Sequence, residues 1–164
     1  MAPLAKRTLI LGPERIERSL ARLACEVDER NRGTDGVILF GIVPKGIMVA
    51  QALARHIGLL AGRTFQPLAL DVRAGHARTD APDISVTGKH VILVDDILYT
   101  GRTARAALDE ISRFGEPASV QLVVLIDRGH RQLPLQPDYV GRKLQTKYRE
   151  RVEVDEALAV YLVE

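Results

Sequence analysis

Apolar positions recur every three to four residues in three stretches of the chain, which predicts three amphipathic helices. The first follows Pro13, a residue favoured at the first helical position, and its apolar set predicts a helix to about Asn31. The second covers 47–57 and is expected to end at Gly58. The third covers 102–114, just before another glycine.

Short apolar runs stand between these helices and predict buried strands. They cover 37–40, 65–72, 90–94 and 120–126, with shorter candidates at 139–140, 152–154 and 158–163. The interval 73–89 is rich in turn-forming residues and is predicted to be a loop. Strands that alternate with helices form βαβ units, so we expect an α/β fold with a parallel sheet covered on both faces. A length of 164 residues suits one domain spanning 1–164.

Composition narrows the class of protein. Aromatic residues make up 4% of the chain and Trp is absent, which argues against a surface that stacks many bases. The net charge of +2 is too near neutral to indicate nucleic-acid binding by itself. The lone Cys25 excludes an internal disulfide, which fits a reducing cytoplasm, and its apolar neighbours predict a buried thiol. No apolar run approaches the ~18 residues of a membrane span, and residues 1–11 do not form a signal peptide.

The segment 91–103 carries the clearest chemistry. A predicted buried strand delivers two adjacent carboxylates, Asp95 and Asp96, at the carboxyl edge of the sheet, where such folds bind ligands. A short loop with Thr100, Gly101 and hydroxyl-bearing neighbours then opens a helix, whose first N–H groups attract a phosphate. Because carboxylates repel phosphate, the two aspartates suit neutral hydroxyls. Together the two parts suit a ribose 5-phosphate.

The two commonest nucleotide-binding patterns do not occur in the chain. It has no Gly-x-x-x-x-Gly-Lys-Ser/Thr pattern and no Gly-x-Gly-x-x-Gly pattern. A purely structural turn with a Thr cap and two solvated aspartates remains an alternative for 91–103. Two acidic residues at the end of such an apolar strand make this structural alternative the less favoured interpretation.

The segment resembles the thirteen-residue signature that type I phosphoribosyltransferases use to bind 5-phosphoribosyl-1-pyrophosphate (PRPP). It is most similar to the form found in bifunctional pyrimidine operon regulators with uracil phosphoribosyltransferase activity. The resemblance continues in 29–33, 121–134 and 137–141 and covers most of the chain. It implies a central parallel sheet flanked by helices with a small hood, and the reaction PRPP + uracil → UMP + pyrophosphate.

The resemblance also implies roles for individual residues. Asp95 and Asp96 would hold the ribose hydroxyls and stabilise positive charge at the anomeric carbon. The 5-phosphate would lie against Tyr99, Thr100, Gly101, Arg102 and Thr103. The loop 41–46 would bind pyrophosphate through Lys45 and Gly46, with Lys45 in the catalytic set. A solvated loop charge is the alternative for Lys45.

Two further expectations concern the same site. The bond between Val43 and Pro44 is expected to be cis, since related loops contain an unusual cis peptide and a bond before proline adopts it cheaply. Magnesium would arrive on PRPP, because it prefers phosphates and waters to protein cages, and no protein metal site is expected.

Segment 126–131 resembles the base-binding hood of the family. There Asp127, Arg128 and Gly129 would contact the base, largely through backbone groups. The Arg128 side chain would lie near the base or near the pyrophosphate. Arg131 is expected to be structural or at the surface. His130 is expected to be a hydrogen-bonded loop histidine and not a general base.

The chain departs from the family in two places. The interval 71–89 is shorter than the family's lid; Arg73, His76 and Arg78 are candidate substitutes, and a wetter, slower site is expected. The first helix has small apolar residues where the family has two polar RNA-facing ones. A basic run consists of Arg142, Lys143, Lys147, Arg149 and Arg151. This run suits RNA phosphates and a solvated face equally, so RNA-dependent attenuation of transcription is not favoured.

Two alternatives to the uracil enzyme remain open. One is a non-catalytic regulator that senses PRPP or UMP and binds RNA. The other is a phosphoribosyltransferase for another nucleobase. The family resemblance also implies a homodimer or a higher homo-oligomer.

Overall fold

A six-stranded sheet forms the centre of the molecule. The computed structural model describes residues 5–73 and 77–164. The strand order is β4-β3-β2-β5-β6-β7, and all neighbours are parallel except the short edge strand β4. The strands are β2 (Val37–Ile42), β3 (Leu68–Asp71), β4 (Arg78–Thr79), β5 (His90–Leu98), β6 (Ser119–Asp127) and β7 (Tyr139–Lys143). The predicted α/β fold with a central parallel sheet is confirmed.

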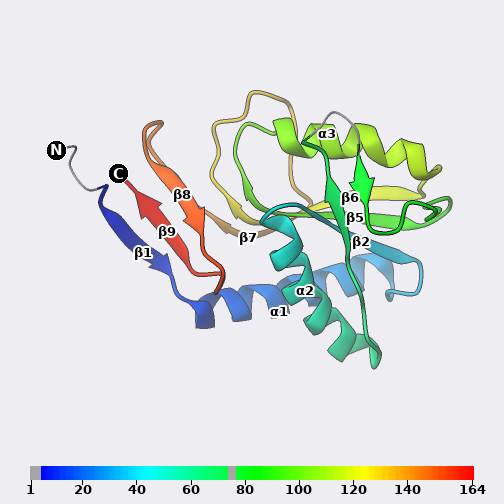
Figure 1. The fold of residues 1–164 in the computed structure, drawn as a ribbon. Coiled ribbons are helices and arrows are strands. Elements are labelled where there is room, and N and C mark those ends of the chain that lie inside the picture. The colour runs from blue at the N-terminus through cyan, green and yellow to red at the C-terminus, as the bar shows by residue number, and fades with distance from the viewer. Residues whose placement is uncertain (1–4, 74–76) are drawn as a thin grey trace.

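Helices cover both faces of this sheet. Figure 1 shows α1 (Pro13–Asn31) and α2 (Gly46–Ala61) on one side and α3 (Arg102–Ile111) on the other. A 3₁₀ turn, Ser112–Phe114, follows α3. Along β5, Ile92 and Val94 belong to the core beneath α1 and α2, whereas Val91 and Leu93 belong to the core beneath α3. Because both faces are buried, the strand is a continuous apolar run.

A second, smaller sheet joins the two ends of the chain. Strands β1 (Arg7–Leu11), β9 (Val160–Val163) and β8 (Arg151–Val154) pair antiparallel in the order β1-β9-β8 (Figure 1). We call this sheet the hood. The sequence assignment of the hood to 126–131 is wrong, because Asp127 ends β6 of the main sheet. Strand β1 was not predicted. Its first three residues are exposed, and Leu11 is its one fully buried residue.

Several predicted boundaries differ from the structure. Helix α2 continues past Gly58 to Ala61 and ends at Gly62, which has a φ of 66°. A Cβ at Gly58 would lie 2.6 Å from the carbonyl oxygen of Arg63, so this glycine permits close packing of the returning chain. The predicted strand 65–72 is shortened to β3. Conversely, β5 runs on to Leu98, so the paired aspartates lie within it.

The prediction of a buried thiol at Cys25 is wrong, because this residue is exposed. Helix α1 buries Leu23, Ala24 and Val27 against the sheet. Cys25 follows Ala24 by about 100° around the helix and therefore turns away from the core.

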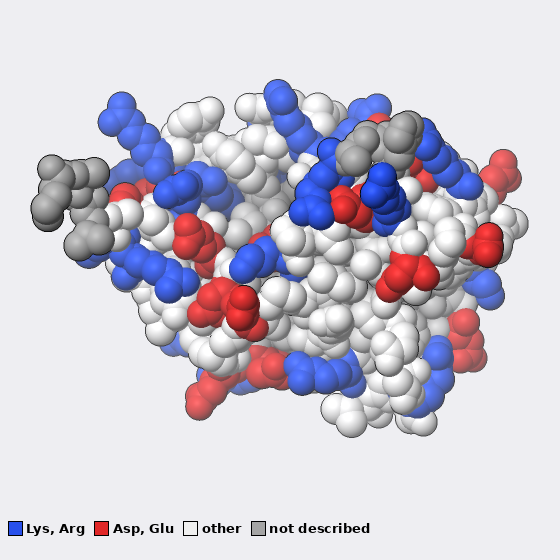
Figure 2. Space-filling model, in the orientation of Figure 1, with Lys and Arg blue, Asp and Glu red and all other residues white. Residues whose placement is uncertain are grey.

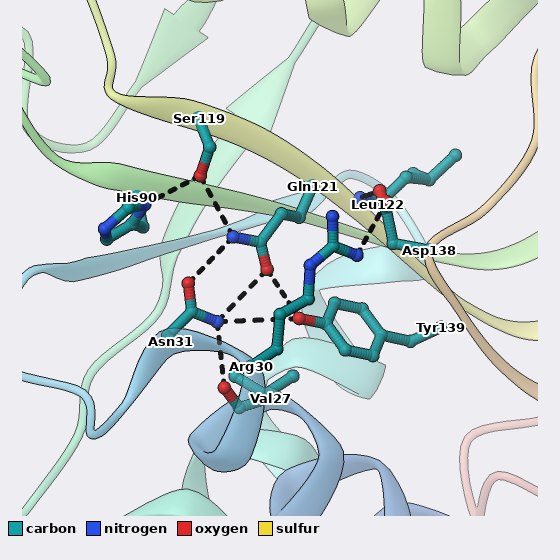
Figure 3. Close-up of polar contacts among 9 residues, drawn as sticks. All are labelled: Val27, Arg30, Asn31, His90, Ser119, Gln121, Leu122, Asp138 and Tyr139. Atoms are coloured by element: carbon teal, nitrogen blue, oxygen red, sulfur yellow. Dashed lines mark hydrogen bonds and ion pairs between the residues drawn. The ribbon is translucent and has the colours of Figure 1, made fainter.

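A buried polar network fixes the end of α1 to the main sheet (Figure 3). The Gln121 amide donates to the Asn31 side chain at 2.8 Å and to Ser119 Oγ at 3.0 Å, and it accepts from the Tyr139 hydroxyl at 2.6 Å. Beside it, Arg30 pairs with Asp138 at 2.8 Å. These residues lie where β5, β6 and β7 begin, at the sheet edge opposite the carboxyl ends of the strands.

Candidate active site

Two adjacent aspartates lie near the carboxyl end of β5. Asp95 is 8% exposed, and its Oδ1 accepts the backbone N–H of Asp96 at 2.9 Å. A Cβ at Gly46 would lie 2.5 Å from the carbonyl oxygen of Val94, so only glycine lets the start of α2 approach this strand. Burial, and then the charge of Asp96, raise the pKa of Asp95 well above its ordinary value. A carboxylate buried beside a second one favours a ligand that brings hydroxyl donors or a cation.

The loop after β5 ends in an uncapped helix. Gly101 has a φ of 91°, a left-handed conformation that favours glycine, and it precedes α3 directly. The N-cap residue Gly101 has no side chain to cap this helix, and among the described residues only the first of its N–H groups, that of Arg102, has a side-chain acceptor. Thr100 Oγ1 accepts the N–H of Arg102 at 3.4 Å, and the Thr103 side chain is exposed. This geometry suits an anion at the helix N-terminus.

A neighbouring loop holds the phosphate segment in place. The carbonyl oxygen of Thr100 accepts the N–H groups of Gln132 at 2.9 Å and Leu133 at 3.2 Å. The Gln132 side chain accepts from Arg102 Nε at 2.9 Å. The segment 131–135 therefore supports the loop from outside the main sheet.

The loop 41–46 connects β2 with α2 and contains a cis bond between Val43 and Pro44, which confirms that prediction. Lys45 is half-buried, and its Nζ donates to the carbonyl oxygen of Val154 in the hood at 2.9 Å. Lys45 is thus not the solvated loop charge that the sequence left as an alternative.

A cleft of about 450 Å³ lies between this loop, β5 and the hood. It is lined by Lys45, Asp96, Ile97, Arg7 and residues 152–156. A larger hollow, of about 1170 Å³, runs along α2 and the segment 62–67, and no predicted site residue lines it. Of these two hollows, the smaller cleft is the one that predicted site residues line, namely Lys45 and Asp96.

The end of β6 brings the predicted base-binding residues beside Tyr99. The backbone N–H of Arg128 donates to the carbonyl oxygen of Leu98 at 3.0 Å, and its guanidinium lies 4.0 Å from the centre of the Tyr99 ring. Asp127 is engaged by the protein, accepting from the Gly129 N–H at 3.0 Å and from Arg131 at 2.8 Å. Of these three residues, only Arg128 has side-chain N–H groups that remain available to donate to a ligand.

Arg131 and His130 make the structural hydrogen bonds that were predicted for them. Arg131 binds Asp127 and also donates to the backbone of Tyr99 and Leu135, each at 3.0 Å, so its role is structural. The Nε2 of His130 lies 2.7 Å from the carbonyl oxygen of Thr146, as expected of a hydrogen-bonded loop histidine.

Within the described part of the interval 71–89, neither Arg73 nor Arg78 is hydrogen-bonded to the paired aspartates. Arg73 is bound to Asp71 through two nitrogens, at 2.8 and 3.0 Å, which lowers the pKa of Asp71 to about 2. Arg78 pairs with Asp71 in the register of β3 and β4. His76 lies outside the described residues. Farther along, Val86 is fully buried, so this part of the interval belongs to the core.

No group of three potential metal ligands among residues 5–73 and 77–164 lies close enough to hold an ion. Two carboxylates beside an open cleft nevertheless suit magnesium that arrives already bound to phosphates. Within the same residues, no helix is long and apolar enough to cross a bilayer.

Charge on the surface is mixed. Figure 2 shows Lys and Arg interspersed with Asp and Glu across one face of the molecule. The side chains of the basic run 142–151 are exposed, and Lys147 lies 3.9 Å from Glu150. Sequence reasoning missed Val154, Arg7 and Thr146 as neighbours of the site, because they belong to short C-terminal or N-terminal segments without a motif.

The chain matches a known family over most of its length. The family model described as the phosphoribosyl transferase domain matches residues 10–157. The chain is 42% identical to the bifunctional protein PyrR of Bacillus mycoides, over 93% of this chain and 92% of that protein.

Solved structures agree on the fold. A hypoxanthine-guanine phosphoribosyltransferase from Bacillus anthracis superposes with a TM-score of 0.78 at 19% identity, over 98% of this chain and 99% of that one. A hypoxanthine phosphoribosyltransferase from Trypanosoma cruzi superposes with a TM-score of 0.79 at 18% identity, over 100% and 87% of the two chains. Such low identity supports the shared fold and says nothing about the base. The match over 10–157 and the close similarity to PyrR show that this chain belongs to the phosphoribosyl transferase domain family.

Proposed function

We propose that the protein transfers ribose 5-phosphate from PRPP to uracil, giving UMP and pyrophosphate, and that the whole chain forms one transferase domain. The observation that carries the proposal is the pair Asp95 and Asp96 on β5, followed after a short turn by helix α3, whose N-cap residue Gly101 has no side chain. The 42% identity to a bifunctional PyrR protein supports a pyrimidine base over the purines of the structural neighbours.

In this proposal the paired aspartates hold the ribose 2′- and 3′-hydroxyls. Their negative charge stabilises the positive character that develops at the anomeric carbon as pyrophosphate leaves. The N–H groups at the start of α3 and the hydroxyls of Thr100 and Thr103 hold the 5-phosphate, beside Tyr99 and Arg102.

Lys45 contacts the leaving pyrophosphate as a point charge, and the backbone of Gly46, at the start of α2, lies beside the pyrophosphate. Magnesium, carried on PRPP, neutralises phosphate charge when it is bound. The side of the site that faces the base is formed by Asp127, Arg128 and Gly129. The hydrogen bond from the Gly129 N–H to Asp127 stabilises the turn.

A panel of bases tests the proposal. Pyrophosphate release from PRPP and Mg²⁺ is measured with uracil and, separately, with hypoxanthine, guanine, adenine and orotate. We expect turnover with uracil and little with the other four. Turnover with a purine in place of uracil would overturn the base, and a lack of turnover with every base would overturn the enzyme.

A second candidate function is regulation through RNA, for which the exposed basic run offers a surface. Five Lys and Arg side chains within 142–151 can neutralise RNA phosphates and release counterions. RNA affinity that falls steeply with salt and responds to UMP would support this function. Salt-insensitive or absent binding would leave the run as a solvated face.

A further inference from the structure

The loop after β7 contacts the predicted base-binding side of the site at several points. Thr146 lies in this loop and is half-buried. Its hydroxyl oxygen accepts from Arg128 Nε at 3.0 Å, and its carbonyl oxygen lies 2.7 Å from His130 Nε2. One residue therefore engages two neighbouring side chains, through its side chain and its backbone.

Arg128 uses two of its three guanidinium nitrogens in hydrogen bonds within the protein. Nε donates to Thr146, and one terminal nitrogen, Nη2, donates to the carbonyl oxygens of Tyr148 and Glu150. The other terminal nitrogen, Nη1, has no acceptor among the described residues. It is also not among the buried polar atoms that lack a partner, so it keeps contact with solvent. The residue as a whole is only 8% exposed.

Aromatic rings restrict the guanidinium further. It lies against the face of Tyr99, 4.0 Å from the ring centre. The His130 ring contacts Tyr99 and Tyr148 edge to face, with both centroid separations at 5.8 Å. With Nε and Nη2 fixed and one face covered, the planar group has a single orientation, and Nη1 alone is free for a ligand.

We propose that Thr146 is a positioning residue that orients Arg128 so that Nη1 donates to an exocyclic oxygen of the base. The inference rests on the proposed function. A guanidinium only donates hydrogen bonds, so this arrangement favours a base with an oxo group there and disfavours one with an amino group. Uracil carries two exocyclic oxo groups, so it meets this requirement whichever of the two faces Nη1. Cytosine has an amino group in place of one of these oxo groups.

Removal of the hydroxyl tests the role. In Thr146→Val, the KM for uracil is expected to rise about tenfold while kcat and the KM for PRPP change little, since the lost bond orients only the base-binding side. The ratio of kcat/KM for uracil to kcat/KM for cytosine should fall. Thr146→Ser keeps the hydroxyl and should retain the wild-type KM for uracil. Thr64→Val, at an exposed position after α2, is the matched control and should change nothing.

The possible results separate cleanly. If wild-type protein releases no pyrophosphate with any base, the proposed function fails. If wild-type protein uses uracil but Thr146→Val has the same KM and base preference, the positioning role fails alone. The role also fails if the Ser variant raises the KM for uracil as much as Val does, since the hydroxyl is then irrelevant. Thermal unfolding of each variant identifies any loss of the fold.

Discussion

Asp95 is a carboxylate that the fold buries beside a second acid, and no cation from the described residues is bonded to it. Its Oδ1 accepts one backbone N–H, and burial outweighs that bond, so its pKa is raised. Arrangements of this kind cost stability and are characteristic of functional sites. At the scale of single residues this is the strongest physical sign of the site.

The raised pKa predicts how stability depends on pH. The folded protein holds the Asp95 proton more tightly than the unfolded chain does, so ionisation costs stability as pH rises above about 3.8 and through the folded pKa. Asp95→Asn should therefore raise the free energy of unfolding at neutral pH, and the gain should vanish in acid. Urea unfolding across this pH range measures it. A gain that grows toward low pH would contradict the account.

Lys45 gives a second prediction at this scale. Lys45→Ala removes a charge from the pyrophosphate loop and the bond to the carbonyl oxygen of Val154. The KM for PRPP should rise by roughly 10- to 100-fold, the cost of one charged hydrogen bond. Steady-state kinetics with varied PRPP checks this, with Lys89→Ala, an exposed lysine before β5, as the control. An unchanged KM for PRPP would remove Lys45 from the site.

The sequence predicted these residues unequally well. The paired aspartates and the phosphate segment are consecutive in the chain, so one motif shows them together. The partner of Lys45 is 109 residues away, on a strand of four residues, and no local pattern could show that contact. The exposure of Cys25 was missed because apolar neighbours in the sequence do not define which side of a helix a residue occupies.

At the scale of elements, the start of α3 concentrates the phosphate chemistry. Gly101 at φ 91° turns the chain from β5 into the helix, and a side chain there would be strained. Gly62, at φ 66°, ends α2 in a similar conformation away from the predicted site residues. Alanine variants at the two positions can therefore distinguish the cost of a left-handed alanine from an effect on ligand binding.

Gly101→Ala should lower the free energy of unfolding by about 1–2 kcal/mol, the cost of a left-handed alanine. It should also weaken PRPP binding, because the strained turn moves the N–H groups that hold the 5-phosphate. Gly62→Ala should cost similar stability without changing PRPP affinity. Urea unfolding and calorimetric titration measure the two effects. Equal PRPP affinity in both variants would contradict the placement of the phosphate.

The three helices and most strands, including the short β7, β8 and β9, were predicted, whereas β1 and β4 were not. Helix α1 agrees with its prediction at both ends, since its apolar spacing and Pro13 mark it clearly. The hood was misplaced, because β1, β8 and β9 have five residues or fewer and pair across the whole chain. Helix α2 was cut short at Gly58, where close packing against the backbone of Arg63 requires a glycine inside the helix.

At the scale of the whole molecule, stability and chemistry lie at opposite edges of the main sheet. The network around Gln121 ties α1 to the starts of the strands (Figure 3). The aspartates, the phosphate turn and Arg128 lie toward the carboxyl ends of the strands. Parallel sheets separate the two roles in this way because their loops at one edge form the ligand site.

This separation predicts that Gln121→Ala damages the fold and spares the site. Gln121 is 3% exposed, and its loss removes the donor to Asn31 Oδ1 and the acceptor of the Tyr139 hydroxyl. The free energy of unfolding should fall by about 2–3 kcal/mol. PRPP affinity measured well below the unfolding temperature should stay at the wild-type value. A parallel loss of affinity would show that the two edges are coupled.

The central claim is that the carboxyl end of β5 and the start of α3 bind PRPP. Calorimetric titration of PRPP with Mg²⁺ into wild-type protein and into Asp95→Asn/Asp96→Asn tests it most directly. We expect saturable binding to the wild type and a loss of at least about 100-fold in the double variant, since two charged hydrogen-bond acceptors for the ribose are removed. Equal PRPP affinity in a folded double variant would contradict the claim.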